Sequence, residues 1–298
     1  MKSILVTGAS TGIGRALAEA IAAGGLRVYA TVRKDEDLRT LNALDGVTAL
    51  RLDVRSAEEV AAVVACIRED GDGLHALINN AAVNGLGPFS TYDDTALREI
   101  FEVNIFGLHR VTNACLPLLV ESRGRVVNIG SQGGVMTARY FGPYTMTKHA
   151  LEAYSASLAE ELEPHGVYVS IVQPGGIESA MADNSLASSA ARFRSAEPPF
   201  DTDAREFLAM LEADEEPDGD APESAENRKP SSPDIVVRAV WHALTAERPQ
   251  RRYLVGTRWE GDRVIHGFLD KLVEANRSPS MGYSRDELVA LLDQHLKE

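Results

Sequence analysis

The sequence predicts an α/β fold of the Rossmann type, a doubly wound, mainly parallel seven-stranded sheet with helices on both faces. Three observations predict it. Short apolar strands alternate with amphipathic helices over roughly the first 175 residues, a glycine-rich turn follows the first strand, and one more strand is indicated near the C-terminus. Parallel neighbours need crossover connections, which the helices supply. Right-handed crossovers then place a ligand crevice at the carboxyl ends of the strands.

The elements are predicted in chain order from their periodicity. The run Ser3-Ile4-Leu5-Val6-Thr7 predicts the first strand, and the pattern after the glycine-rich turn predicts a helix over 12–23. Leu-Arg-Val-Tyr-Ala-Thr-Val predicts a strand over 26–32, and the next strand is expected at 47–52 with no helix predicted between them. The following segments are a helix over 56–69, a strand over 74–79, a helix over 93–120, a strand over 125–130, a helix over 143–163 and a strand over 167–172.

Residues 1–298 are expected to form a single domain, and the sequence pattern changes after Gly176. Pro198-Pro199 interrupts an irregular helical pattern. The stretch at about 214–233 is rich in proline and holds seven acidic residues between Asp214 and Glu226, which predicts a flexible loop. A helix from Asp234, a strand at 252–256 and two terminal helices follow. The expected parts are a cofactor-binding and catalytic core over 1–176, a substrate-side lid over 177–233, and C-terminal helices with the last strand over 234–298.

The composition excludes several classes of protein. Of 298 residues, 44% are apolar, which is enough for a large core and excludes a disordered chain. The net charge of −14 argues against nucleic-acid binding, which needs a basic surface. Cys66 and Cys115 lie far apart in apolar patterns, and no metal-ligand spacing is present, so no metal is expected. We expect no signal peptide, no membrane span and a cytoplasmic location.

The glycine-rich turn is the first candidate site. Gly8, Gly12 and Gly14 follow a strand and open a helix, in the segment Thr7-Gly8-Ala9-Ser10-Thr11-Gly12-Ile13-Gly14. Missing Cβ atoms let a backbone approach a pyrophosphate, and the helix start offers free N–H groups and a positive dipole end. A purely structural turn is the alternative, and its position at the first strand-helix junction disfavours that alternative.

A tyrosine and a lysine form the second candidate site. Tyr144 and Lys148 lie four residues apart, so a helix places them on one face. Tyrosine has a pKa of about 10, too high for a base near neutrality. A neighbouring ammonium and an oxidised nicotinamide are both expected to favour the phenolate and to lower this pKa. The two motifs together predict an enzyme that transfers hydride between a nicotinamide and a carbonyl or alcohol.

Further motifs follow the predicted strands in order and carry a resemblance to a known family. They are Leu52-Asp53-Val54, Asn79-Asn80-Ala81, Asn104, Ser131 and Pro174-Gly175. With the Gly-x-x-x-Gly-x-Gly turn and the Tyr-x-x-x-Lys pair they cover nearly all of 1–180, and on them the chain resembles the classical short-chain dehydrogenase/reductase family. The stretch Tyr29-Ala30-Thr31-Val32-Arg33 is similar to the hydroxysteroid and retinol dehydrogenase branch. Ala82 and Ser179 depart mildly from the usual Gly and Thr.

The resemblance implies roles for single residues. Ser131 is expected to hold the substrate oxygen against Tyr144, Lys148 to grip the nicotinamide ribose, and the backbone carbonyl of Asn104 to anchor a water beside Lys148. Asn104 as an ordinary polar residue inside a helix remains an alternative. Asp53 is expected to meet the adenine amino group, with a helix-capping role, for which Ser56 competes, left open. The implied cofactor residues are Gly8, Ser10, Thr11, Gly12, Ile13, Gly14, Arg33, Asp53, Val54, Asn80, Ala81, Tyr144, Lys148, Pro174, Gly175, Ile177 and Ser179.

The end of the second predicted strand selects the cofactor. An acidic residue there would bind the ribose diol and repel a 2′-phosphate, but Arg33 and Lys34 follow Val32, with no acid before Asp35. The guanidinium of Arg33 is suited to a bidentate contact with a phosphate, and the hydroxyl of Ser10 is suited to donate a further hydrogen bond. NADP(H) is therefore preferred over NAD(H), which remains possible. In the alternative, Arg33 and Lys34 are solvated loop charges.

The substrate is expected to be a hydrophobic ketone, aldehyde or alcohol, because the candidate wall residues are mainly apolar. The family often pairs through the helices at 93–120 and 143–163, which implies a homodimer or homotetramer. A regulatory NADP-binding protein without turnover is the alternative function, and the complete Ser, Tyr and Lys set disfavours it. The candidate substrate contacts are Ser131, Gln132, Tyr140, Tyr144 and Met181.

Overall fold

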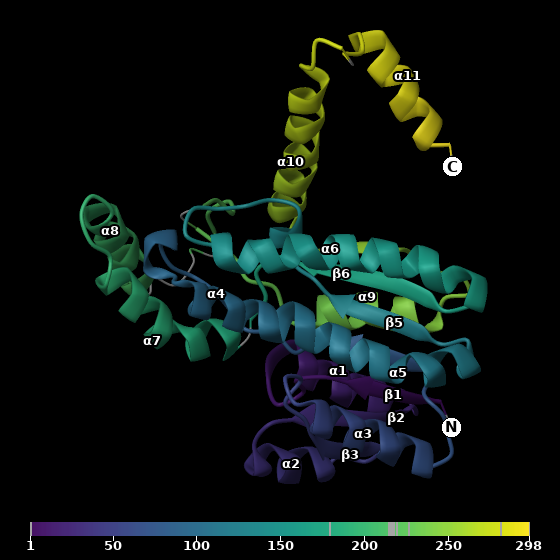
Figure 1. Cartoon of the computed structure of the whole chain (residues 1–298). Coiled ribbons are helices and arrows are strands. Elements are labelled where there is room, and N and C mark those ends of the chain that lie inside the picture. The colour runs from purple at the N-terminus through teal and green to yellow at the C-terminus, as the bar shows by residue number, and fades with distance from the viewer. Residues whose placement is uncertain are drawn as a thin grey trace.

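A computed structural model describes residues 2–178, 180–213, 218, 220–225, 227–280 and 282–297. The predicted Rossmann-type fold is confirmed: seven strands form one sheet in the order β3-β2-β1-β4-β5-β6-β7, and every pair of neighbours is parallel (Figure 1). The order reverses at β1, which has β2 on one side and β4 on the other. The strands are β1 Ser3–Val6, β2 Arg27–Val32, β3 Val47–Arg51, β4 Ala76–Asn79, β5 Arg125–Ile129, β6 Tyr168–Pro174 and β7 Arg252–Val255.

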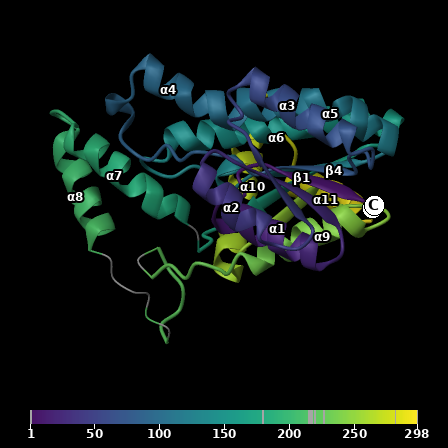
Figure 2. The same ribbon diagram turned by 90° about the horizontal axis from the view of Figure 1, so that it is seen from below.

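Helices cover both faces of the sheet, and each face buries its own apolar cluster. One cluster joins the sheet to α1 (Gly12–Ala23), α2 (Asp35–Asn42) and α9 (Asp234–Thr245). The other joins it to α3 (Ala57–Glu69), α5 (Leu108–Ser122) and α6 (Gly142–Leu162). Figure 2 shows the two helical layers on opposite sides of the strands.

One helix was missed by the sequence prediction. α2 occupies Asp35–Asn42, a short and strongly polar segment in which only Leu41 is buried. Its three acidic residues stand in the first turn, where they interact favourably with the positive end of the helix dipole. A single buried residue leaves too little periodicity for a sequence pattern to detect.

The predicted helix at 93–120 is divided in the structure. α4 (Asp94–Phe101) passes into a π-helical segment, Glu102–Gly107, before α5 begins. The combined run Asp94–Ser122 is long and apolar enough to cross a membrane by length and composition alone. Its buried residues Val111, Cys115 and Leu119 pack in the core, as those of a core helix do.

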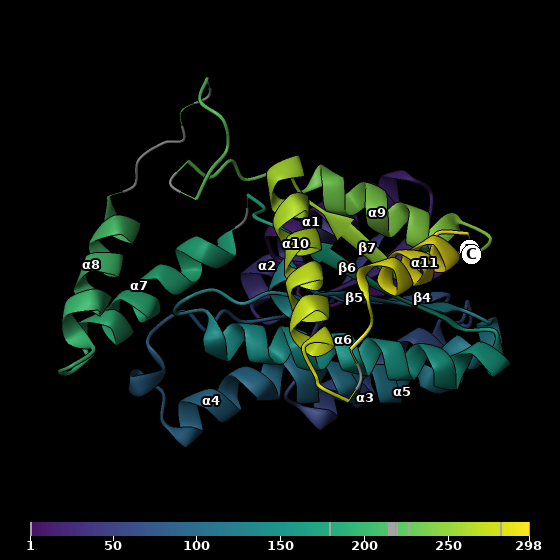
Figure 3. The ribbon, with the colours of Figure 1, turned by 90° about the horizontal axis from the view of Figure 1, so that it is seen from above.

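The segment after β6 forms a lateral pair of helices. α7 (Ala180–Arg194) and α8 (Asp201–Glu212) enclose a small apolar cluster around Phe193, and Pro198-Pro199 lies between them as the sequence predicted. Figures 2 and 3 show the pair beside the start of α4, at one end of the molecule. The C-terminal helices α10 (Arg258–Asn276) and α11 (Arg285–His295) extend away from the sheet (Figure 1).

Candidate active site

A cleft of about 380 Å³ lies at the carboxyl ends of β1 to β4, where the strand order reverses. Open parallel sheets bind ligands at this position. The structure brings most of the predicted cofactor residues together there. Those that line the cleft are Gly8, Ser10, Thr11, Gly12, Ile13, Gly14, Arg33, Asp53, Val54, Asn80 and Ala81.

The glycine-rich turn is shaped by close backbone contacts. Gly8 has φ of +68°, and a Cβ on it would lie 2.9 Å from Cα of Ala81. A Cβ on Gly14 would collide with the carbonyl oxygen of Gly8 and lie 2.5 Å from Nδ2 of Asn80. The first turn of α1 therefore packs directly against the loop that precedes it, and this contact leaves no room for a side chain at Gly14.

Asn80 holds this turn from the neighbouring strand. Its Nδ2 donates to the carbonyl oxygens of Thr7 at 3.0 Å and of Gly8 at 2.9 Å. In return, the hydroxyl of Thr7 accepts from the amides of Asn80 at 3.0 Å and Ala81 at 3.1 Å. The side-chain amide of Asn80 thus joins the end of β1 to the end of β4, and it shapes the cleft by holding the backbone of Thr7 and Gly8.

The start of α1 is suited to an anion. Thr11 stands at its N-cap with no capping hydrogen bond from its side chain, and the first turn holds no acidic residue. The N–H groups of the first helical turn are left without intrahelical acceptors, and the helix dipole adds positive potential. The adjacent turn that contains Gly8 and Gly14, called the glycine cradle below, has no side chain at these two positions that would block a ligand. Together with the helix start, it fits the pyrophosphate of a dinucleotide.

Arg33 lies at the cleft, where its charge helps to lower the pKa of Asp53. It lines the cavity and, within the described ranges, its guanidinium makes no hydrogen bond or ion pair. Lys34 instead pairs with Glu36, and Asp35 pairs with Arg51. Asp35 and Glu36, two of the three acidic residues that follow β2, are therefore each paired with a cation other than Arg33, which remains available for a ligand.

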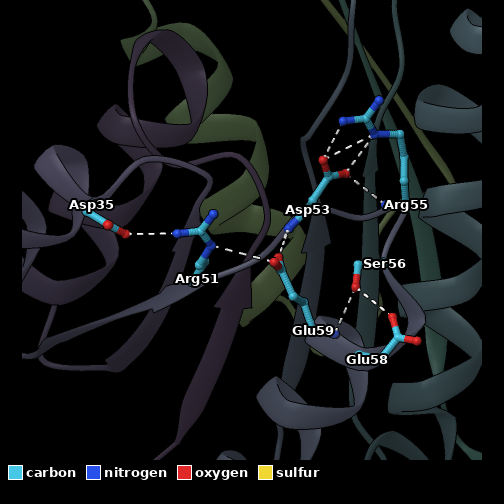
Figure 4. A network of polar contacts seen from close by, with 7 residues as sticks. All are labelled: Asp35, Arg51, Asp53, Arg55, Ser56, Glu58 and Glu59. Carbon is cyan, nitrogen blue, oxygen red and sulfur yellow. Dashed lines mark hydrogen bonds and ion pairs between the residues drawn. The ribbon is translucent and has the colours of Figure 1, made fainter.

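Asp53 is engaged by its own neighbour. Arg55 donates to both carboxylate oxygens, with contacts of 2.6 to 3.1 Å, and these bonds hold the pKa of Asp53 below its usual range. The backbone amide of Asp53 donates to Glu59 at 2.5 Å, and Ser56 caps α3 by accepting from Glu59 (Figure 4). Asp53 is therefore not the cap of α3, and adenine would meet a carboxylate already held by Arg55.

Ser131, Tyr144 and Lys148 meet beyond the end of β5. Ser131 follows this strand and lies close enough to the side chain of Tyr144, in the first turn of α6, to act against the rise of its pKa. One turn later, Nζ of Lys148 donates to the carbonyl oxygen of Ile129 at 2.9 Å and lies 5.5 Å from the centre of the Tyr144 ring. The predicted helical spacing is therefore realised, with the lysine side chain buried.

The titration of this group is governed by burial. Burial raises the pKa of Tyr144 to about 12, while the hydroxyl of Ser131 acts in the opposite direction. Burial also lowers the pKa of Lys148 to about 8, and the negative charge of Glu152 opposes that fall. With the protein's own groups alone, desolvation is thus the largest influence on the pKa of both side chains.

Asn104 fastens the loop after β4 to the active-site helix. Its side chain accepts from the amide of Val83 at 2.8 Å and donates to the carbonyl of Val83 and to the hydroxyl of Thr147, both at 3.0 Å. It is 3% exposed and stands in the π-helical segment. π turns frequently occur at functional sites. The side chain of Asn104 thus links the β4 loop to α6 next to Lys148.

The turn after β6 lies outside the cleft. The amide of Gly175 donates to Val255 at 2.8 Å and that of Gly176 to Glu260 at 2.7 Å, so both amides are used within the protein. Ile177 forms an isolated bridge with Ser231. Ser179 lies outside the described residues, and so does the side chain of Met181.

A second cavity of about 1070 Å³ lies near the start of α6. Ser131, Tyr144 and Lys148 are not part of its lining, although Gly142 and Thr145 on either side of the tyrosine are. Tyr140 lines it and also packs edge-on against Phe193 and Phe207. Gln132 lines neither cavity, since its side chain is 7% exposed and Nε2 donates to Val255 at 3.1 Å.

Several residues of the cleft were not predicted to line a cofactor site. Val32 ends β2 and Leu52 directly follows β3, so the rule that ligands bind at the carboxyl ends of strands would have identified both. Ser188 belongs to α7, and only the folded chain brings it to the cleft. No group of three metal-ligating side chains occurs in the part of the chain that the structure describes. The remaining lining residues are Ala82, Val83, Asn84 and Val103.

Comparison with known proteins places the chain in a family. Residues 2–190 match the model of the short chain dehydrogenases. An NADPH-dependent 3-dehydrocapnine reductase from Ornithobacterium rhinotracheale is 33% identical over 271 residues, covering 86% of this chain and 88% of that protein. The mitochondrial D-beta-hydroxybutyrate dehydrogenase of Rattus norvegicus is 33% identical over 262 residues, covering 85% and 76%. A short-chain dehydrogenase structure from Streptomyces avermitilis superposes with a TM-score of 0.74 at 30% identity, covering 92% and 94%.

The structural match agrees with the seven-stranded parallel sheet of this chain. The protein is an NAD(P)-dependent dehydrogenase/reductase that acts on CH–OH groups and the corresponding carbonyls. The chain belongs to the short chain dehydrogenase family.

Proposed function

We propose that the protein is an NADP(H)-dependent oxidoreductase that interconverts a hydrophobic ketone or aldehyde with its alcohol, with Tyr144 as general acid and base. The observation that carries this proposal is that Ser131, Tyr144 and Lys148 meet beyond β5, with the lysine one helical turn after the tyrosine. The acidic group and its orienting hydroxyl lie beyond β5, and the cleft with the glycine cradle lies beyond β1 and β4.

The residues of this chain divide the work of the reduction. Bound NADPH supplies the hydride. Ser131 donates a hydrogen bond to the substrate oxygen, and Tyr144 gives that oxygen a proton, so that charge developing on it meets two donors already in place. Lys148 is held by the carbonyl of Ile129, and its ammonium supplies positive charge that stabilises the tyrosinate left by proton transfer.

Preference for NADP(H) is supported by the charges around the cleft. Arg33 is free to bind a phosphate, whereas the carboxylates of Asp35 and Asp53 are both engaged by arginines. The relative from Ornithobacterium rhinotracheale is described as NADPH-dependent. A guanidinium without a hydrogen bond or ion pair among the described residues and carboxylates paired with other arginines together favour the dinucleotide that carries a 2′-phosphate.

Charge reversal at Arg33 is expected to weaken NADPH binding by about 10- to 100-fold, the loss of a charge-assisted hydrogen bond. NADH affinity should change far less. Lys34→Asp is the matched control, because it makes the same charge change one position later at a residue that does not line the cleft. Fluorescence titration of both cofactors measures the effect. An Arg33→Asp variant with unchanged NADPH affinity would contradict the assignment.

Activity is expected to fall as pH rises through the pKa of Lys148, about 8, because the ammonium is then lost. Glu152 raises this pKa, and its carboxylate is anchored by Gln173 at 2.7 Å and Arg252 at 2.9 Å. In Glu152→Gln the alkaline limb of the kcat/KM profile should therefore move to lower pH. The exposed Glu160, also on α6, supplies the control variant Glu160→Gln. An alkaline limb that stays in place would refute this role for Glu152.

A hydrophobic substrate is supported by the segment that precedes Tyr144. Ala138, Tyr140 and Gly142 line the larger cavity, and Phe89, Phe101 and Phe200 add aromatic walls. Oxidation of NADPH in the presence of a panel of hydrophobic and hydrophilic carbonyl compounds tests the proposal. Faster turnover of the hydrophobic members supports it. Tight NADPH binding without turnover of any member would favour a regulatory protein instead.

Pairing with a second copy is part of the proposal, because Phe106 is 52% exposed and Met146 is 41% exposed on helices of the same layer. Leu151 and Leu158 belong to the core and carry no such argument. Light scattering measures the oligomeric state.

A further inference from the structure

The first turn of α10 contains a buried carboxylate, Glu260, which is 2% exposed. Its Oε2 accepts from the amide of Thr257 at 3.1 Å, which completes a capping box. Its Oε1 accepts from the amide of Gly176 at 2.7 Å, in the turn that follows β6. A Cβ on Gly175 would collide with the same carboxylate. The side chain therefore lies directly against the Gly175-Gly176 backbone.

The same carboxylate also binds the segment that returns from the lateral helices. Arg228 donates to Oε1 of Glu260, and its guanidinium lies 4.9 Å from the centre of the Trp259 ring. Three residues later, the amide of Ser231 donates to Gly176 at 2.8 Å, and its carbonyl accepts from Glu178 at 3.0 Å. One side chain thus joins α10, the turn after β6 and the end of the segment 177–233.

Helix capping alone does not account for this arrangement. α11 has an equivalent capping box, in which Glu287 accepts from the amide of Ser284 at 2.8 Å. Glu287 is exposed, and within the described residues it has no partner outside its own helix start. Burial of a charge costs free energy unless several donors compensate it. The free-energy cost of burying Glu260 is offset by the donors of Gly176 and Arg228.

We propose that Glu260 is a positioning residue for hydride transfer: its carboxylate sets the Gly175-Gly176 turn, which follows β6 beside the strand that leads to Ser131, and Arg228 fastens the end of the segment 177–233 to it. The inference rests on the proposed function. The adenosine end is held by separate residues at the ends of β1 to β3. Loss of the carboxylate should therefore disturb the reacting end of the cofactor and leave the adenosine end intact.

Glu260→Gln is expected to lower kcat by about 10- to 100-fold, the cost of a small misplacement of the reacting groups. The affinity for 2′,5′-ADP, a fragment without nicotinamide, should stay within about twofold of the unchanged protein, because its contacts are elsewhere. Glu287→Gln removes the same group from the other capping box and should leave both kcat and fragment affinity unchanged. Steady-state kinetics and calorimetric titration measure these quantities.

Arg228→Gln provides a second route if Glu260→Gln does not fold. It leaves both backbone bonds of Glu260 in place, so a smaller fall in kcat and faster proteolysis within 177–233 are expected. The inference is overturned if the wild-type protein turns over a carbonyl and both variants keep its kcat, or if fragment affinity falls in parallel with kcat. A wild-type protein without turnover on any carbonyl overturns the proposed function, and this inference with it.

Discussion

Replacement of Tyr144 by phenylalanine is expected to lower kcat by about 100- to 10,000-fold, the usual contribution of a general acid. The hydroxyl is the only group removed, and Ser131 is left to donate to the substrate oxygen without a proton to follow. NADPH binding should be nearly unchanged, because the tyrosine does not line the cleft that contains the glycine cradle. Single-turnover kinetics and fluorescence titration separate the two quantities.

Tyr154→Phe is the control for this substitution. Tyr154 stands on the same helix and lies 3.4 Å from Nδ1 of His109, so its hydroxyl is likewise used for a side-chain contact. Its removal should leave turnover close to that of the unchanged protein. Substantial residual turnover in Tyr144→Phe would show that another group supplies the proton, and the proposed mechanism would then be wrong.

A single methyl group at Gly14 is expected to destabilise the protein by about 3 kcal/mol and to abolish cofactor binding. Alanine is the better helix former by about 1 kcal/mol, so the loss must come from the collision with Gly8 and Asn80. Relief of that collision requires movement of the backbone that forms the cradle. Urea denaturation and NADPH titration of Gly14→Ala measure both effects.

Gly267→Ala tests whether the effect belongs to the site. Gly267 lies inside α10, and its added Cβ would meet only Cβ of Met136, at 3.9 Å, an ordinary contact. This variant should be more stable by about 0.5–1 kcal/mol, with normal cofactor binding. Equal losses of stability in the two variants would mean that the close packing at Gly14 is not the cause.

The strands and most helices could be predicted because their signals are local. Runs such as Ile4-Leu5-Val6 are buried on both faces of a parallel sheet, and they remain recognisable without any knowledge of their neighbours. The short helix at Asp35–Asn42 was missed because it packs on β2 and β3 through few residues and has little apolar periodicity of its own. The π-helical segment was missed because a changed hydrogen-bond register has no periodicity of its own.

The candidate site likewise contains residues that the sequence predicts and contacts that only the folded chain shows. Gly8 and Gly14 were recognised from spacing, since a turn that approaches a phosphate excludes side chains. The sequence could not show that Arg55 occupies the carboxylate of Asp53, or that Gln132 is tied to Val255, because these contacts depend on how the side chains are finally arranged. The sequence also could not show how strongly burial raises the pKa of Tyr144, because desolvation is a property of the packed site.

The sequence by itself determined the fold and the set of reacting side chains, because periodicity and motif spacing are properties of neighbouring residues. The tertiary structure alone decided which charges are free. It left Arg33 available, engaged Asp53, buried Lys148 and placed Glu260 beneath a turn 84 residues earlier. Burial and pairing set the protonation and the position of these groups, and both depend on segments that meet only after the chain has folded.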